Sequence, residues 1–105
     1  MKIQVGTDSN IEGNTVLVQA VETVVRDTLD RFSSQITRVE VHLSDENSGE
    51  KFGTDDKRCL LEVRLASHQP IAVTDRAATP EQAVSGAAEK MKNLLETTLG
   101  RLSDR

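Results

Sequence analysis

ITRVEVHLSDENSGEKFGTDDKRCLLEVRLA, residues 36–66, is the segment that decides the fold. Apolar and polar side chains alternate at its start, over residues 36–44, and again at its end, over residues 57–66. A period of two places all the apolar side chains of a strand on one face. The segment therefore predicts two neighbouring strands joined as a hairpin, with one face toward a core and the other left to water or to a partner.

The residues between these strands, SDENSGEKFGTDD, are strongly acidic. They carry five acidic side chains and one lysine, a net charge of −4 that equals the formal charge of the whole chain. An EF-hand calcium loop starting at Asp45 needs glycine at its sixth position and glutamate at its twelfth, but Gly49 comes one position early and the twelfth residue is Asp56. A solvated hairpin tip is the favoured interpretation, and a looser cation site at Asp45, Glu46, Asp55 and Asp56 is the alternative.

A strand and a helix are predicted before this hairpin. KIQVG alternates over residues 2–6, and from residue 15 to residue 32 the apolar side chains recur at helical spacing. Asn14 is a suitable N-cap for that helix because its side-chain oxygen can accept a hydrogen bond from the first turn. The side of the helix expected to face the sheet consists of Leu17, Ala20, Val21, Val24, Val25, Thr28, Leu29 and Phe32.

A fourth strand and a second helix are predicted after the hairpin. Residues 71–77 alternate again, and residues 80–102 have helical spacing. Thr79 is the expected N-cap, Pro80 suits the first helical position and Gln82 completes a capping box. The expected buried side of this helix consists of Val84, Ala87, Ala88, Met91, Leu94, Leu95, Thr98 and Leu102.

The order of elements is therefore β-α-β-β-β-α, within one domain that spans residues 1–105. A strand, a helix and a following strand favour a right-handed crossover between parallel strands, whereas hairpins join antiparallel ones. Only one face of the strands alternates apolar, so both helices must cover that face. The sequence predicts an α+β fold, a two-layer sandwich with a four-stranded mixed sheet and two helices on one side.

Composition and motifs argue against several classes of protein. The chain has a single cysteine, Cys59, which excludes an internal disulfide and a cysteine-based zinc site, and which we expect to be buried on its strand. No apolar run approaches the ~20 residues that span a bilayer, and no secretory signal begins the chain, so we expect a cytoplasmic protein. Phosphate-binding loops, nucleophile elbows and zinc-protease motifs are absent, and His42 and His68 have no ligand partners nearby. We therefore expect no enzyme activity, no cofactor and no metal.

Nucleic-acid binding stays open. The chain has no Trp or Tyr and only two Phe, which disfavours a sheet on which bases stack. Phosphate contact is the remaining mode: Lys90, Asn93, Thr97 and Arg101 follow one another at intervals of three, four and four residues along the second helix. The same ridge also fits an ordinary solvated helix surface.

The element order, the stretches ITRVEVHLSDEN and DKRCLLEVRL, and the final TPEQAVSGAAEKMKNLLETTLGRL together resemble a known family. It is the family of ribosome hibernation-promoting factors and ribosome-associated inhibitors, also called sigma-54 modulation proteins, in its short single-domain form. The resemblance implies a fold like that of double-stranded-RNA-binding domains. It also implies a site on the small ribosomal subunit near the decoding region, occupied in stress or stationary phase.

In this family, cations on both helices face ribosomal RNA. The positions of this chain that match are Arg26, Arg31, Lys90, Lys92 and Arg101. We add as second-rank RNA contacts three arginines on the polar face of the predicted sheet, namely Arg38, Arg58 and Arg64.

An alternative of another class remains open. The chain would then be a protein-interaction module that has lost ribosome binding. A homodimer would form through the open sheet face, where Leu60 is apolar among polar residues, and the acidic segment 44–56 would recognise a basic partner.

Overall fold

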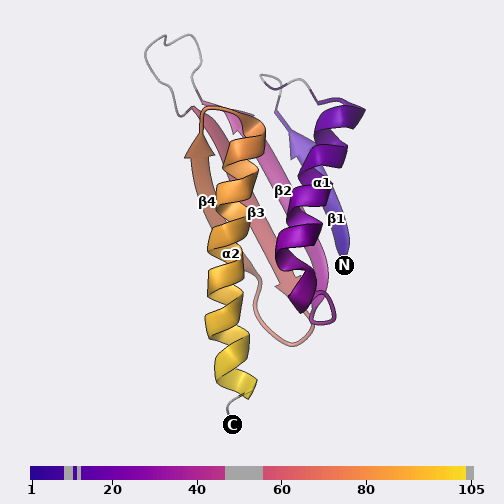
Figure 1. Cartoon of the computed structure of the whole chain (residues 1–105), viewed down its shortest axis with the longest axis vertical. Helices are drawn as coiled ribbons and strands as arrows, with labels where there is room; N and C mark the ends of the chain where they lie inside the picture. The colour runs from indigo at the N-terminus through magenta and orange to yellow at the C-terminus, as the bar shows by residue number, and fades with distance from the viewer. Residues whose placement is uncertain (9–10, 12, 47–55, 104–105) are drawn as a thin grey trace.

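The computed structural model describes residues 1–8, 11, 13–46 and 56–103, with side chains as far as Gly100 (Figure 1). Its elements follow the predicted order, with a 3-10 turn after the first helix. They are β1 (Lys2–Thr7), α1 (Thr15–Leu29), the 3-10 turn (Asp30–Phe32), β2 (Ile36–Asp45), β3 (Lys57–Leu65), β4 (Ile71–Ala77) and α2 (Pro80–Ser103).

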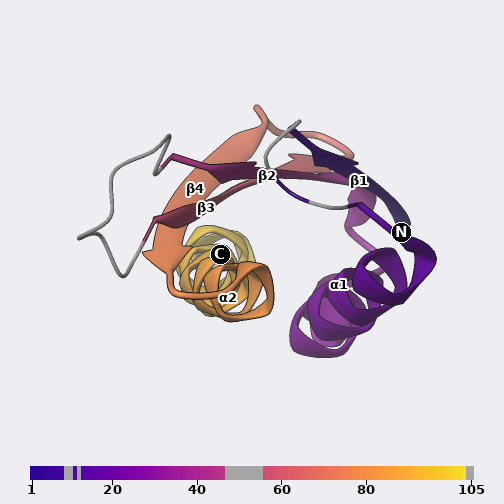
Figure 2. The same cartoon turned by 90° about the horizontal axis from the view of Figure 1, so that it is seen from above.

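The four strands form one mixed sheet in the order β1-β2-β3-β4. β1 runs parallel to β2, and the other neighbours are antiparallel. Both helices lie on the same side of this sheet, as the view along the helices in Figure 2 shows. This arrangement confirms the predicted α+β sandwich. Within the described part of the chain, neither helix has the length and apolar character needed to cross a lipid bilayer.

The core lies between the sheet and the helices. The inward side chains of β2 and β3 are almost completely buried, and α1 and α2 each contribute one apolar stripe. The side chains of this core include Val39, Val41, Leu43, Leu61 and Val63 from the sheet, with Val21, Val25, Leu29, Val84, Ala87, Met91 and Leu95 from the helices. Burying a side chain of this kind stabilises a fold by about 1.5–3 kcal/mol, so the cluster supplies the main driving force for folding.

Both predicted helix caps are present. The Asn14 Oδ1 atom accepts a hydrogen bond from the Leu17 amide at 2.9 Å, and the Thr79 Oγ1 atom accepts one from the Gln82 amide at 3.1 Å. Each satisfies an amide of the first turn that has no partner inside the helix. The caps therefore fix where the two helices begin.

The ends and faces of the helices differ from the prediction in two places. The α-helix predicted to run to residue 32 ends at Leu29, and the tighter 3-10 turn that follows still buries Phe32. On α2, Leu94 was predicted to be buried but is 39% exposed. The buried stripe passes instead through Leu95 toward Leu99, which packs against the core, and this leaves Leu94 at the edge of the stripe.

A polar contact joins the middle of α2 to β4. The Lys90 Nζ atom lies 3.0 Å from the Asp75 Oδ1 atom and donates a hydrogen bond of 2.8 Å to the Thr74 carbonyl oxygen. The other oxygen of the same carboxylate lies against Gly86, where an added Cβ would overlap it. Glycine at this position therefore lets α2 approach the strand closely enough for the ion pair to form.

The substitution Gly86→Ala should lower the free energy of unfolding by about 0.5–2 kcal/mol. The new methyl group must displace the Asp75 carboxylate from Lys90, at a cost of about 1–3 kcal/mol, and the higher helix propensity of alanine offsets about 0.5–1 kcal/mol of it. The measurement is urea unfolding. Gly100→Ala is the matched control on the same helix: nothing lies within 4 Å of its added Cβ, so it should be neutral or stabilise by about 0.5–1 kcal/mol. In an Asp75→Ala background the cost of Gly86→Ala should largely disappear. An equal cost in both backgrounds would contradict the proposed overlap.

Cys59 is buried on the inward face of β3, as predicted. The pKa of its thiol is raised to about 12, chiefly by burial; the charge of Asp75 adds to the rise and Arg58 opposes it. The thiol therefore stays protonated in the folded protein, while in the unfolded chain it ionises near its ordinary pKa.

Stability should therefore fall as the pH rises above 9, because the unfolded chain then loses the Cys59 proton and the folded protein keeps it. Between pH 8 and pH 10 the free energy of unfolding of the wild type should fall by about 1.4 kcal/mol more than that of Cys59→Ala. Urea unfolding of both proteins at the two pH values measures this difference. Parallel pH dependences would show that the thiol makes no contribution.

Candidate nucleic-acid interface

Two of the expected RNA contacts lie at the C-terminal end of the first helical segment. Arg26 is exposed on α1, and Arg31 is exposed on the 3-10 turn. The Arg31 Nη1 atom lies 2.9 Å from the Glu96 Oε2 atom of α2, and its guanidinium stands 5.1 Å from the centre of the Phe32 ring. An exposed ion pair contributes about 0–1 kcal/mol, so a phosphate can compete with Glu96 for Arg31.

The expected contacts on α2 have different surroundings. Lys90 is turned toward β4, where it pairs with Asp75. The Lys92 Nζ atom lies 3.8 Å from the Glu89 Oε2 atom one turn earlier. Arg101 belongs to the last turn of α2, beyond the side chains that the structure describes. The ridge predicted from Lys90 to Arg101 therefore begins with a lysine already engaged by the sheet.

Basic and acidic side chains are mixed on the helical side. Among the described side chains of residues 15–32 and 80–100, four are basic and six are acidic. The basic ones are Arg26, Arg31, Lys90 and Lys92, and the acidic ones are Glu22, Asp27, Asp30, Glu81, Glu89 and Glu96. The helical side thus offers separate cations rather than a continuous positive strip.

The open face of the sheet arranges its charges in rows across the strands. Strand register places Arg38 opposite Lys2 on one side and Arg64 on the other. At the other end of the sheet, Arg58 lies opposite Arg76. Between these two cationic rows lies an acidic row formed by Glu40 and Glu62. Lys2 and Arg76 were missing from the predicted contacts, although the alternation of their strands already indicated the face on which they lie.

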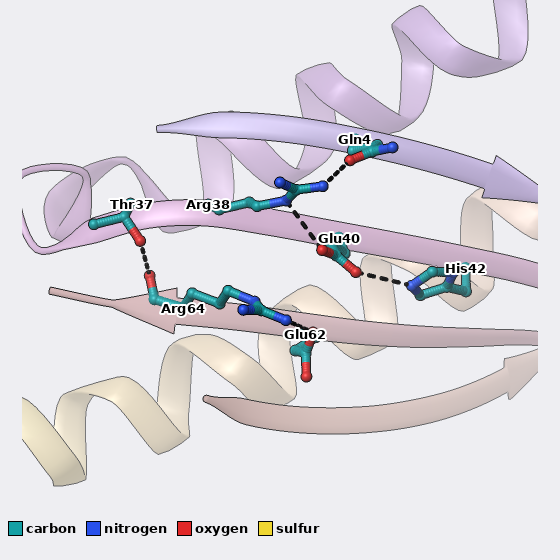
Figure 3. Close-up of polar contacts among 7 residues, drawn as sticks. All are labelled: Gln4, Thr37, Arg38, Glu40, His42, Glu62 and Arg64. Carbon is teal, nitrogen blue, oxygen red and sulfur yellow. Dashed lines mark hydrogen bonds and ion pairs between the residues drawn. The ribbon is translucent and has the colours of Figure 1, made fainter. Parts of the chain in front are cut away.

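The ion pairs drawn in Figure 3 run along the strands and not across them. The Arg38 Nε atom lies 3.0 Å from the Glu40 Oε2 atom without the geometry of a hydrogen bond, and an Nη atom of Arg38 donates to Gln4. His42 Nε2 lies 3.4 Å from the other oxygen of Glu40. Arg38 is therefore positioned on the face by Glu40 on its own strand and by Gln4 on the neighbouring strand.

The second cationic row, formed by Arg58 and Arg76, shares the carboxylate of Glu46. Glu46 pairs with Arg76, and its Oε2 atom lies 3.8 Å from the Arg58 Nε atom. Glu46 follows β2 directly, and its amide donates a hydrogen bond of 2.9 Å to the Asp56 carbonyl oxygen. Glu46, which belongs to the acidic segment 44–56, therefore lies at the end of the open sheet face and contacts both arginines.

The two ends of the acidic segment meet at Lys57. The Lys57 Nζ atom lies 3.0 Å from the Asp56 Oδ1 atom and 3.3 Å from the Asp45 Oδ2 atom. The hydrogen bond to Asp56 raises the pKa of Lys57, desolvation opposes that rise, and Asp45 adds to it. Asp55 and the rest of residues 47–55 lie outside the described residues, so the alternative cation site is only partly seen. Within the described ranges no group of three or more His, Cys, Asp or Glu side chains could hold a metal ion.

Comparison with known proteins identifies a family. Residues 7–103 match the family described as sigma 54 modulation protein / S30EA ribosomal protein. No curated protein sequence matches the chain.

Two solved structures have a similar fold. One is the N-terminal domain of Protein Y from Thermus thermophilus, with a TM-score of 0.72 and 20% identity, covering 93% of this chain and 99% of that one. The other is a ribosomal subunit interface protein from Coxiella burnetii, with a TM-score of 0.75 and 14% identity, covering 95% of this chain and 99% of that one. At these identities the likeness establishes the shared fold.

Proposed function

Since the chain belongs to the sigma 54 modulation protein and S30EA ribosomal protein family, a family of ribosome-associated factors, we propose that it regulates translation by binding small-subunit ribosomal RNA. The site would lie near the decoding region and would be occupied in stress or stationary phase. The family match over residues 7–103 carries this proposal. This function requires no catalytic step and no cofactor. We also propose that the protein acts in the cytoplasm.

The proposed contacts are electrostatic. Arg26, Arg31, Lys90, Lys92 and Arg101 approach phosphates from the helical side, and Arg38, Arg58 and Arg64 are a second set on the sheet. Each cation that meets a phosphate releases condensed counterions, which makes the affinity depend on salt. Because Arg31 and Lys92 hold their carboxylates in exposed pairs, with Glu96 and Glu89, the exchange of carboxylate for phosphate at these two cations costs little.

The overall negative charge is compatible with RNA binding because of its distribution. The segment 44–56 holds the whole excess of −4, and the other residues carry twelve basic and twelve acidic side chains. Repulsion between this segment and RNA is lowest when the segment points into solvent. At ~0.15 M salt, charges farther apart than about 8 Å are largely screened from one another, so the segment opposes contacts far from it only weakly. Glu46, which belongs to the segment, competes directly with phosphate for Arg58 and Arg76.

Co-sedimentation with purified small ribosomal subunits at several salt concentrations tests the proposal. The wild type should bind, and its affinity should fall steeply as the salt concentration rises. The variant Arg26→Gln/Lys92→Gln should bind more weakly and show a salt dependence reduced by up to about two phosphate contacts. Ser67→Glu/Gln69→Glu, in the exposed turn between β3 and β4, changes the net charge equally and should bind like the wild type. Absence of binding by the wild type even at low salt would refute the proposed function.

Glu96→Gln should strengthen binding to the small subunit. The change frees Arg31 from its ion pair and removes a negative charge from the helical side, so an increase in affinity of up to about five-fold is expected from the modest energy of an exposed pair. The readout is again co-sedimentation. Glu81→Gln removes the same charge from the first turn of α2 and serves as the control. If both variants gained equally, only net charge and not the release of Arg31 would be responsible.

A further inference from the structure

We propose that the open face of the sheet is itself an RNA-binding surface of this chain, and the one on which it depends most. The inference deepens the proposed function and rests on it for the identity of the partner. It assigns contacts to Lys2 and Arg76 in addition to the three sheet arginines already named. The helical cations then make the weaker contribution.

The first argument for RNA binding on the sheet compares the charges of the open sheet face with those of the helical side. The outward side chains of the strands include five cations and two carboxylates: Lys2, Arg38, Arg58, Arg64 and Arg76 against Glu40 and Glu62. Two more carboxylates lie at the end of the face: Glu46 pairs with Arg76, and Asp8 lines one hollow together with Arg58, His42 and Ser44. The helical side has four basic and six acidic described side chains. The open face of the sheet, on the side away from the helices (Figure 2), therefore has a small local excess of positive charge, whereas the described helical side has an excess of negative charge.

The second argument is the register of the strands, which places arginines directly opposite each other. Arg38 faces Arg64 across β2 and β3, and Arg58 faces Arg76 across β3 and β4. Like charges directly opposite each other destabilise a sheet, and opposite charges there contribute roughly 0.2–1 kcal/mol. Stability alone would thus favour a carboxylate in place of one member of each pair. A polyanion laid over the face removes this repulsion, so the arrangement suits a negatively charged partner better than it suits the free protein.

The spacing of the rows indicates an extended partner. Arg38 and Ser44, which mark the two cationic rows on β2, are six residues apart, or about 20 Å at ~3.3 Å per residue. A small anion reaches only one row, whereas a nucleic-acid backbone presents phosphates to both and can pass over Glu40 and Glu62 between them. No Phe, Tyr or Trp side chain lies on the described sheet face, and His42 is the only aromatic ring among the described outward side chains, so most contact falls on phosphate and ribose rather than on bases.

A second copy of this chain fits the face less well. Two such faces brought together would oppose the same positive excess, and the apolar surface available to compensate is limited to half-buried Leu60 and exposed Ala72 among the described outward residues. An acidic protein would satisfy the charge, but RNA is the anionic component that the proposed function already supplies.

The test compares two variants with equal changes in charge. Arg64→Gln/Arg76→Gln removes one exposed arginine from each cationic row, and Arg26→Gln/Lys92→Gln removes two cations from the helices. Affinity for small subunits and for a blunt 16-base-pair RNA duplex is measured over a range of salt, and thermal unfolding checks the fold. The sheet variant should lose at least ten-fold in affinity for both targets, with a salt slope reduced by about two, and more than the helix variant loses.

Other outcomes separate the inference from the proposed function. If the helix variant loses binding and the sheet variant does not, the inference fails while the proposed function stands. If the wild type binds the duplex through the sheet but not the subunit, the proposed function fails and the inference stands. Loss on the subunit without loss on the duplex would identify a ribosomal protein as the partner and overturn the inference. A dimer in solution that the sheet variant abolishes, with no RNA binding, would overturn both.

Discussion

Burial of a single face of the sheet is the constraint on which the rest of the structure depends. Val39, Val41, Leu61 and Val63 have no exposed surface, and they can reach that state only if both helices lie on the same side. The opposite face keeps its charged and polar side chains because nothing in the described chain covers it. Side chains alternate between the two faces of a strand, so burial of the apolar face against the helices leaves the polar face exposed. Hydrophobic burial on one side of the sheet therefore determines which residues on the other side are available to a partner.

The distribution of charge follows from the burial of one face of the sheet and the exposure of the other. Close packing against the sheet restricts where the helices can place their charges, and Lys90 is drawn toward Asp75 for that reason. The open face of the sheet does not pack against the helices, so its charged side chains are not restricted in this way. Its arginines lie beside carboxylates of the same face: Arg64 is 3.7 Å from Glu62 on its own strand, and Arg58 is 3.8 Å from Glu46, which follows β2. A protein with a net charge of −4 can thus present a positive surface, because its excess acid lies in one segment.

Local patterns were sufficient to predict the elements and their caps, since alternation, helical spacing and the side chains of Asn14 and Thr79 act over a few residues. Contacts between distant residues were not predictable in this way. Arg31 and Glu96 are 65 positions apart, and their pairing depends on how α1 and α2 pack. The contact of Asp75 with Gly86 likewise depends on how α2 packs against β4, and only the structure shows it. The RNA contacts of individual residues remain predictions.

The contact between Lys90 and Thr74 has a further consequence for solubility. β4 is an edge strand, and an exposed edge is a template on which a second molecule can add a strand and begin to aggregate. Lys90 binds this strand through the Thr74 carbonyl oxygen and the Asp75 carboxylate. A lysine beside an edge strand places a positive charge where another strand would have to add, and this disfavours edge-to-edge pairing. Lys90 therefore discourages aggregation as well as joining the two layers of the protein.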